Sequence, residues 1–252
     1  MPTLDVLNLL DRLTPYMEGW DEQRRLHDAV VDGSRDNVLM LVEHEPVYTA
    51  GKRTQPEDRP TDGSPVIDVD RGGRITWHGP GQLVGYPILD LRPDRCDVHA
   101  YVRDLEEVMI RTCLDFGVPA GRLQGLTGTW VAGNKIGAIG VRISRWITSH
   151  GFAFNVNTDL SHFQLIVPCG IADAGVTSLA RVLRVAPAHE AVEAAFIAAF
   201  TRMFHVEHLV TADTVEVPEV QSVLHAIAGV HGREVAVMVD GLTVRAVACE
   251  RE

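Results

Sequence analysis

Three segments of the sequence bring together residue types that could transfer a chemical group. The first runs from Arg71 to Gln82 and reads RGGRITWHGPGQ. Its glycines allow the backbone to approach a ligand closely and to direct N–H groups at it, while its arginines and histidine add polar contacts. The segment contains neither a Walker loop nor a GxGxxG pattern, so it predicts a ligand-binding loop of another kind. A tight hairpin around the Pro-Gly turn is the alternative.

The second segment, VPCGI, places Cys169 on a loop between a proline and a glycine. Such a loop can expose the sulfur and offer N–H groups to a thiolate or an oxyanion. The other cysteines differ, since Cys113 falls on the apolar face of a predicted helix, Cys96 lies in a polar loop and Cys249 lies near the end of the chain. Cys169 is therefore the candidate nucleophile, and an unreactive packed cysteine is the alternative.

The third segment, GNKIGAIGV, contains Lys135. The chain has 21 arginines and two lysines, Lys52 and Lys135, so arginine supplies almost all of its basic side chains. A lysine in such a chain indicates a need for an amine, because an amine can lose its proton under a modest perturbation whereas a guanidinium cannot. The alternative is a surface lysine that follows a β-turn at Gly133-Asn134.

The composition excludes several classes of protein. The 252 residues are 46% hydrophobic and 23% charged, which is typical of a soluble globular chain. The net charge of −11 disfavours nucleic-acid binding. There is no basic n-region at the N-terminus, and no window approaches the ~18 apolar residues of a membrane span, so we expect a cytoplasmic protein that does not bind membranes. His205 and His208 lack a third ligand nearby, so we expect no metal site.

The apolar periodicity predicts the elements that must position these segments. Apolar residues at helical spacing predict helices at Tyr16–Val31, Asp97–Phe116 and His189–His205. Other apolar runs predict strands at Val38–Val42, Val66–Val69 and Leu83–Leu91, and a β-rich region over Thr129–Phe154. Because strands and helices do not alternate regularly, the pattern favours an α+β fold.

The three segments together resemble the lipoyl (octanoyl) transferase family. The family carries RGG-x-x-T-x-HGPGQ, K-I-x-A-x-G and PCGI stretches, found here at Arg71–Gln82, Lys135–Gly140 and Pro168–Ile171. Two further stretches, at residues 43–51 and 150–160, also resemble the family, and the matches run in order from about residue 16 to 205. Trp77 departs from the smaller tyrosine or phenylalanine of the family pattern.

The resemblance implies a mixed, largely antiparallel sheet flanked by helices, as in the catalytic domain of biotin and lipoate ligases. It implies transfer of an octanoyl group from octanoyl-acyl carrier protein to a lysine of lipoyl-domain proteins, through a cysteine thioester and without ATP. Dehydrogenase-complex acyltransferase subunits and the glycine cleavage H protein are examples of such acceptors. This transfer is the first step of protein lipoylation. We expect a monomer that needs no cofactor.

Residue by residue, the resemblance implies that Cys169 and Lys135 are catalytic. It implies a substrate-binding set that consists of Arg71, Gly72, Gly73, Arg74, Ile75, Thr76, Trp77, His78, Ala138, Ile139, Gly140, Gly151, Phe152 and Ala153. Residues 1–212 are expected to form the catalytic domain. Residues 213–252 match no family stretch and are expected to form an extension with a helix over 221–228 and a β-hairpin around Asp240-Gly241.

Three other functions remain open at this point. An ATP-dependent lipoate ligase on the same fold would not need Cys169. A Cys/His thioesterase, with His78 or His150 beside the cysteine, would release free octanoate. A binding module for acyl carrier protein would catalyse nothing.

Overall fold

The computed structural model describes residues 3–167, 175–211, 235–239 and 242–246. The chain divides into two compact units, Met1–Val210 and Thr211–Glu252. Within the second unit, strand β12 (Val235–Val239) pairs antiparallel with β13 (Leu242–Ala246). The turn predicted at Asp240-Gly241 and the helix predicted over 221–228 lie outside the described residues, so the 213–252 extension stays a prediction.

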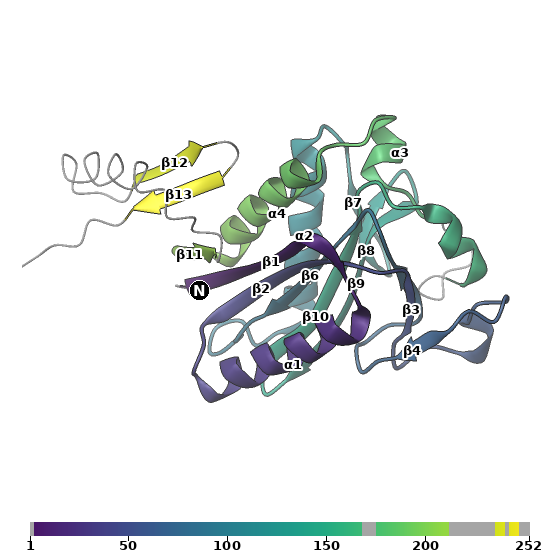
Figure 1. Cartoon of the computed structure of the whole chain (residues 1–252), viewed down its shortest axis with the longest axis horizontal. Helices are drawn as coiled ribbons and strands as arrows, with labels where there is room; N and C mark the ends of the chain where they lie inside the picture. Colours follow the sequence, from purple (N-terminus) through teal and green to yellow (C-terminus); the bar gives the residue numbers. More distant parts are fainter. Residues whose placement is uncertain (1–2, 168–174, 212–234, 240–241, 247–252) are drawn as a thin grey trace, which may run out of the picture. The chain divides into compact units, whose positions relative to one another are not determined.

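The first unit is built on an eight-stranded sheet in the order β11-β1-β2-β6-β10-β9-β8-β7 (Figure 1). Its strands are β1 (Thr3–Thr14), β2 (Asn37–His44), β6 (Gln82–Ile88), β7 (Gly121–Leu123), β8 (Leu126–Val131), β9 (Asn134–Ser144), β10 (Ile147–Asn155) and β11 (His208–Thr211). β1 and β2 are parallel, and each neighbouring pair from β2 to β7 is antiparallel. The predicted mixed, largely antiparallel sheet is confirmed.

A second, three-stranded sheet in the order β4-β3-β5 stands beside the larger one. Its strands are β3 (Val47–Ala50), β4 (Val66–Asp68) and β5 (Thr76–His78), and the short 3-10 helix η1 (Pro56–Asp58) lies between β3 and β4. β3 pairs with β4 in parallel and with β5 in antiparallel register. This small sheet holds the part of the Gly-rich segment that contains His78.

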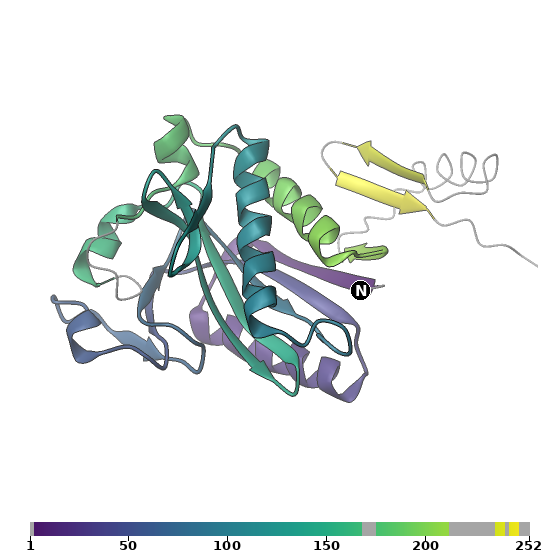
Figure 2. The same ribbon diagram turned by 180° about the vertical axis from the view of Figure 1, so that it is seen from behind.

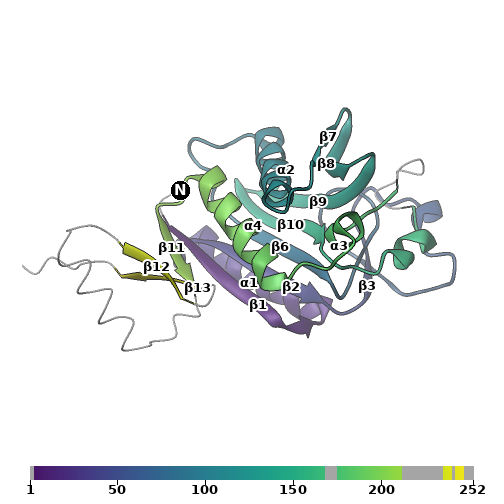
Figure 3. The same ribbon diagram turned by 90° about the horizontal axis from the view of Figure 1, so that it is seen from above.

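Helices cover both faces of the large sheet (Figures 2 and 3). They are α1 (Tyr16–Asp32), α2 (Val98–Asp115), α3 (Leu179–Leu183) and α4 (His189–Phe204), with a second 3-10 helix η2 (Leu160–Leu165). α1 packs on one face, and α2 and α4 pack together on the other. The three long helices agree with the predicted ranges to within one residue at each end. The Asp97 carboxylate caps α2 by accepting the N–H groups of His99 and Ala100.

Alternate residues of β2 serve the two faces of the sheet, because successive side chains of a strand point to opposite sides. Val38, Met40 and Val42 pack with apolar residues of α1. Leu39 and Leu41 belong to the larger cluster beneath α2 and α4. The short apolar run predicted as a buried strand is therefore buried on both faces.

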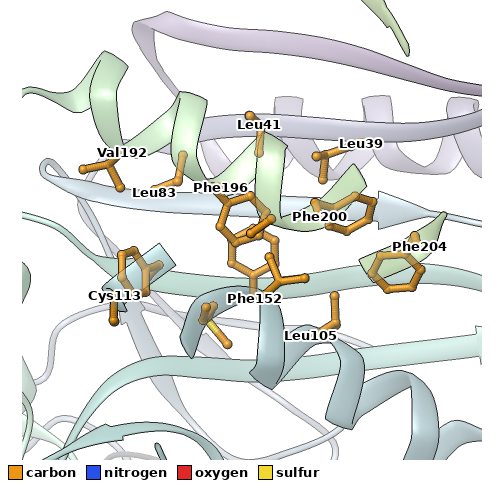
Figure 4. Close-up of a cluster of buried hydrophobic side chains, with 14 of the residues drawn as sticks. Leu39, Leu41, Leu83, Leu105, Cys113, Phe152, Val192, Phe196, Phe200 and Phe204 are labelled. Atoms are coloured by element: carbon orange, nitrogen blue, oxygen red, sulfur yellow. The ribbon is translucent and has the colours of Figure 1, made fainter. Parts of the chain in front are cut away.

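The larger cluster contains a row of stacked aromatic rings (Figure 4). The ring of Phe152 on β10 stacks on Phe196 of α4 with centroids 4.4 Å apart, and Phe200 stacks on Phe204 at the same distance. Four-residue spacing places the three α4 rings on one face of the helix. All four phenylalanines are buried, so this row fixes α4 against the strand that carries part of the candidate site.

Removing one ring of this row is expected to destabilise the protein strongly. Phe196 is 0% exposed, and Phe196→Ala should lower the free energy of unfolding by about 3–5 kcal/mol through lost burial and a residual cavity. Urea denaturation measures the change. Val185, which is 67% exposed, supplies the control Val185→Ala, expected to stay within about 0.5 kcal/mol of the parent protein. Equal losses in the two variants would contradict the described packing.

Strand β1 was not among the elements predicted from the sequence. Its burial alternates only over Leu4 and Val6, and its register with β2 shifts between Leu9 and Leu13. A strand with such short alternation carries a weak local signal. Its stability comes from pairing with β2, which follows only after α1, so the interaction that forms it is non-local.

Candidate active site

A cavity of about 570 Å³ lies among β5, β6, β9 and β10 and the loop that precedes β5. Such a volume is typical of small-molecule sites, which occupy about 300–1,000 Å³. The predicted site residues that line it are Arg71, Gly73, Arg74, Thr76, His78, Lys135, Ala138, Ile139, Gly140, Gly151, Phe152 and Ala153. The fold thus brings together stretches that lie far apart in the sequence.

Small residues on paired strands form one wall of the cavity. Gly140 of β9 lies opposite Gly151 of β10, and Ala138 lies opposite Ala153. A Cβ at Gly140 would lie 3.0 Å from Cδ of Arg71 and 3.1 Å from the carbonyl oxygen of Gly72. The Gly-rich loop therefore packs directly against the backbone of this wall, and a larger side chain would separate them.

Three predicted site residues do not line the cavity. In β5, Thr76 and His78 face the cavity, so Trp77 points to the opposite side of the strand. There Trp77 stacks on His162 with centroids 4.4 Å apart and packs in a cluster with Ile75. The size of Trp77 is thus accommodated in this cluster and not in the cavity. Gly72, the third, donates its N–H to the carbonyl of Val141 and joins the loop to β9.

Cys169 lies outside the described residues, together with the rest of the PCGI stretch. The described residues on either side of this segment are Val167 and Gly175. The N–H of Val167 donates to the carbonyl of Asp58, and the carbonyl of Gly175 accepts the N–H of Lys135. Both flanks are therefore hydrogen-bonded to elements that contribute to the candidate site.

An irregularity in the sheet directs Lys135 into the cavity. Thr129 of β8 pairs with Gly137 of β9, but the next residue, Trp130, pairs with Lys135. Ile136 is left without a partner, which is the pattern of a β-bulge. Because of the extra residue, Lys135 lines the cavity on the same side as Ala138, although their separation by three positions would place them on opposite faces of a regular strand.

Lys135 is 8% exposed, yet it makes no ion pair with any carboxylate in the described part of the chain. Its ammonium nitrogen lies 4.8 Å from the centroid of the Trp130 ring. Its backbone is held between Gly175 and Thr177 by two hydrogen bonds of 2.9 Å each. The side chain is therefore fixed at the cavity, beside the strand-like connection that leaves the PCGI segment.

The guanidinium of Arg71 holds the Gly-rich loop together from inside. It donates to the carbonyls of Gly72, Arg74 and Thr49 and to the hydroxyl of Thr49, at 2.8–3.0 Å. Arg71 is 7% exposed, so these bonds are largely shielded from water. Arg71 therefore has a structural role in the cavity wall, in addition to the positive charge that it places at the cavity.

Arg74 is fixed by a buried carboxylate. Its Nε donates to Oδ2 of Asp58 at 2.7 Å, and Asp58 is 1% exposed. The same Asp58 side chain accepts the N–H of Gln55, which orders the loop around η1. Since the Asp58 carbonyl also accepts from Val167, this aspartate links the Gly-rich loop to the chain just before Cys169.

Two buried histidines, His44 and the cavity-lining His78, are held neutral. Nδ1 of His44 donates to the carbonyl of Thr14, so its Nε2 accepts from the hydroxyl of Tyr86 at 2.6 Å. Burial lowers the pKa of His44 to about 4. Burial also lowers the pKa of His78 to about 3, and the positive charge of Arg71 adds to this effect.

The contacts of His78 fix its tautomer as well. Nδ1 lies 2.8 Å from Oε1 of Gln82, which can only accept, so Nδ1 carries the proton. Nε2 is then an acceptor for the hydroxyl of Thr49 at 3.3 Å. A neutral His78 that lines the cavity can orient a substrate by polar contact without adding charge.

Sequence reasoning missed several cavity residues, which are Tyr16, Arg53, Gln55, Val84, Tyr86, Gly125, Leu126 and Thr127. Tyr16 begins α1, and its ring stacks on His78 with centroids 6.0 Å apart. Burial raises the pKa of Tyr16 to about 12, so it stays a neutral hydroxyl. No local pattern marked these residues, because each lies in an ordinary helix, strand or turn.

His150, the first residue of the family-like stretch 150–160 and the histidine that a Cys/His hydrolase would use, also lines the cavity. Its Nε2 donates to Oδ1 of Asp70 at 2.7 Å, and Arg142 pairs with the other oxygen of Asp70. Burial lowers the pKa of His150 despite the Asp70 hydrogen bond, which acts in the opposite direction. The Nε2–H of His150 is therefore engaged by Asp70.

The neutral histidines predict a loss of stability in acid. A histidine in the unfolded chain binds a proton near pH 6.5, whereas folded His44 does so only near pH 4. Between these values the unfolded state binds more protons than the folded state. The free energy of unfolding therefore falls by about 1.4 kcal/mol for each pH unit by which the pH is lowered, for each such histidine. Urea denaturation from pH 7 to 5 measures the slope. His44→Gln is expected to remove one histidine's share of it.

The exposed His99 is the control site for this experiment. His99→Gln is expected to retain the slope of the parent protein. A slope that is identical in His44→Gln and the parent would show that His44 does take up a proton in the folded state above pH 5.

No group of three or more His, Cys, Asp or Glu side chains that could hold a metal ion is found in residues 3–167 and 175–211 or the two described C-terminal strands. None of the helices in the described part of the chain is both long enough and apolar enough to cross a membrane.

Two comparisons with known sequences agree with each other. The family of lipoyl protein ligase A/B catalytic domains matches residues 15–201. An octanoyltransferase from Salinispora tropica is 58% identical over 174 residues, which cover 67% of this chain and 81% of that protein. An octanoyltransferase from Thermobifida fusca is 59% identical over 175 residues, which cover 66% of this chain and 74% of that protein.

Solved structures with similar folds include a bi-partite lipoate protein ligase from Thermoplasma acidophilum. It aligns with a TM-score of 0.62 at 17% identity, over 84% of this chain and 88% of that one. A biotin protein ligase from Aquifex aeolicus aligns with a TM-score of 0.50 at 13% identity, over 98% of this chain and 86% of that one. The predicted likeness to the fold of lipoate and biotin ligases is confirmed.

Proposed function

The chain belongs to the lipoyl (octanoyl) transferase family and is an acyltransferase of protein lipoylation, and on that premise we propose that it moves octanoate from acyl carrier protein to a lysine of a lipoyl domain, through a thioester on Cys169 and without ATP. The acceptors that fit are dehydrogenase-complex acyltransferase subunits and the glycine cleavage H protein. We further propose that residues 1–212 form the catalytic domain, and that the reaction takes place in the cytoplasm.

One observation carries the proposal. The cavity has a wall of small and apolar residues on β9 and β10 and the Lys135 amine in its lining. The flanks of the PCGI segment are hydrogen-bonded to Lys135 itself and to Asp58, which binds Arg74 of the lining. A nearby cation lowers the pKa of a cysteine thiol and so favours the reactive thiolate at neutral pH. A lysine that has no ion pair with the described residues is suited to that task.

The cavity also suits an acyl chain. Val84, Ala138, Ile139, Phe152 and Ala153 supply apolar surface, and the glycines leave space between them. Burial of six methylenes at ~0.8 kcal/mol each contributes roughly 5 kcal/mol of binding. We propose that the polar groups of the Gly-rich loop and His78 hold the thioester end of the substrate.

In the loading step, the Cys169 thiolate attacks the carbonyl carbon of the donor thioester. The bond between that carbon and the phosphopantetheine sulfur breaks, and the octanoyl group remains on Cys169 as a new thioester. The departing sulfur takes a proton from the Lys135 ammonium. Lys135 is then a neutral amine.

In the transfer step, the acceptor lysine amine attacks the acyl-enzyme carbonyl. An amide bond forms, the carbon–sulfur bond to Cys169 breaks, and the thiolate is restored. The surplus proton of the attacking amine passes to Lys135, which becomes an ammonium again. Each cycle leaves the enzyme unchanged, with one thioester consumed and one amide formed.

The energetics explain why ATP is unnecessary. Exchange between two thioesters is nearly balanced, since the same kinds of bond break and form. The conversion of thioester to amide is favourable because the amide has stronger resonance. A ligase, by contrast, must first activate a free carboxylate.

The experiment that tests this function mixes the purified protein with octanoyl-acyl carrier protein and an apo-lipoyl domain, without ATP. Intact-mass spectrometry is expected to show an octanoyl adduct on the lipoyl domain. A requirement for ATP would favour a lipoate ligase. Release of free octanoate without an adduct would favour a thioesterase, and no turnover at all would favour a binding module.

A further inference from the structure

Lys135 lies against one face of a buried tryptophan. Lys135 and Trp130 are direct cross-strand partners between β9 and β8, and the ammonium nitrogen lies 4.8 Å from the ring centroid. Directly opposed residues of an antiparallel pair share a face of the sheet and are close enough to interact. The contact follows from strand register, so it is built into the sheet.

Trp130 is a buried residue of β8, the strand that lies between β7 and β9. Trp130 is 3% exposed, and its partner on the other neighbouring strand is Gly121, which has no side chain. Lys135 is the residue of β9 opposite Trp130, and the β-bulge at Ile136 turns its side chain toward the cavity. Trp130 itself does not line the cavity, so it touches the lysine and not the space for substrate.

A tryptophan face stabilises an ammonium differently from a carboxylate. The attraction arises from the ring quadrupole, and it strengthens when the pair is shielded from water. An aromatic face accepts no proton from the lysine and leaves the N–H bonds free to reach other groups. A carboxylate would hold those N–H bonds in strong hydrogen bonds and would compete with a thiolate for them.

We propose that Trp130 is the positioning residue for Lys135 and holds the amine over the indole face, ready to exchange protons with the reacting sulfur and amine. This inference rests on the catalytic role proposed for Lys135. It adds that the role depends on an aromatic partner outside the substrate cavity. No carboxylate oxygen of the described residues lies within 4 Å of the Lys135 ammonium nitrogen.

Kinetics of paired variants test the proposal. Trp130→Leu removes the aromatic face and is expected to lower kcat for transfer to the lipoyl domain by about 10-fold, with the donor KM unchanged. Trp130→Phe keeps an aromatic face and is expected to retain activity to within about 3-fold. If phenylalanine is no better than leucine, an aromatic contact is not what matters and the proposal is wrong.

A double-mutant cycle separates positioning from general damage to the fold. Where Lys135 is already glutamine, Trp130→Leu is expected to cost less than about 2-fold more, because its effect acts through the lysine. A further 10-fold loss in that background would overturn the proposal. If Lys135→Gln alone retains full transfer, the catalytic role of Lys135 fails, a different outcome from failure of the Trp130 contact.

NMR tests the contact without reference to activity. The chain has two lysines, so labelling with ¹³Cε-lysine gives one ε-methylene signal from Lys135 and one from the exposed Lys52. The ring current of Trp130 is expected to shift the Lys135 signal upfield, and Trp130→Leu is expected to abolish that shift. Lys52 is the internal control. A Lys135 signal that is the same in both proteins would overturn the contact.

Asp173 provides a last discrimination, because this carboxylate lies in the sequence near Lys135's neighbour Gly175 and outside the described residues. Asp173→Asn is expected to leave the upfield Lys135 signal in place. If Asp173→Asn abolishes transfer and removes the shift while Trp130→Leu does neither, a carboxylate holds the lysine and the proposal is wrong.

Discussion

Cys169→Ser is expected to abolish octanoyl transfer, with a loss of at least about 10³-fold, while the protein remains folded. The reason is that a serine hydroxyl is far less ionised than a thiol beside an ammonium, so the nucleophile is lost. Intact-mass spectrometry after mixing with octanoyl-acyl carrier protein is expected to show an octanoyl adduct on the parent protein and none on the variant.

Two other cysteines supply matched controls. Burial raises the pKa of Cys113 to about 12, so this thiol stays protonated, and Cys96 is exposed. Cys113→Ser and Cys96→Ser are therefore expected to form the adduct as the parent does. An adduct that persists in Cys169→Ser would remove Cys169 from the mechanism.

The second large effect is expected for Lys135→Arg, which keeps a positive charge but removes a proton that can be exchanged. Loading of Cys169 is expected to survive, because a guanidinium can still stabilise a thiolate and the departing phosphopantetheine thiolate can take its proton from water instead of Lys135. Transfer to the lipoyl domain is expected to fall by about 10²-fold or more, the usual loss when a general acid–base is removed. Single-turnover experiments, followed by mass spectrometry, measure the two steps separately.

The exposed Lys52 is the control site, and Lys52→Arg is expected to retain both steps. Because a guanidinium is bulkier than an ammonium, misplaced substrate is a rival cause of any loss. Lys135→Ala with added small amines separates these causes, since rescue that follows amine basicity indicates proton transfer. If Lys135→Arg transfers octanoate as fast as the parent from pH 6 to 9, the proton-transfer role is wrong.

The long helices could be predicted because their information is local. In α4, Phe196, Phe200 and Phe204 recur every four residues, and this spacing alone places them on one face. In α2, Asp97 precedes the apolar face and caps the helix end. Strand β1 could not be predicted in the same way, because its partner β2 lies beyond α1.

For the site, the sequence singled out Lys135 by its rarity and the Gly-rich loop by its composition. Neither the rarity of lysine nor the composition of the loop indicates where a side chain points. The alternation of β5 sends His78 into the cavity and Trp77 away from it, which depends on which face of that short strand is covered. The family resemblance implied that Trp77 contacts substrate, because it lies within the motif. A motif records which residues are neighbours in the sequence, not where their side chains point.

The sequence by itself determined the helices, the α+β class and the stretches that belong near the reaction, because periodicity and residue type are properties of the chain alone. Only the tertiary structure decided that Tyr16, Tyr86 and His150 complete the cavity, and that Trp130 faces Lys135. The physical reason is strand register. A single unpaired residue, Ile136, reverses which side of β9 carries Lys135, and that reversal exists only when β8 and β9 are paired.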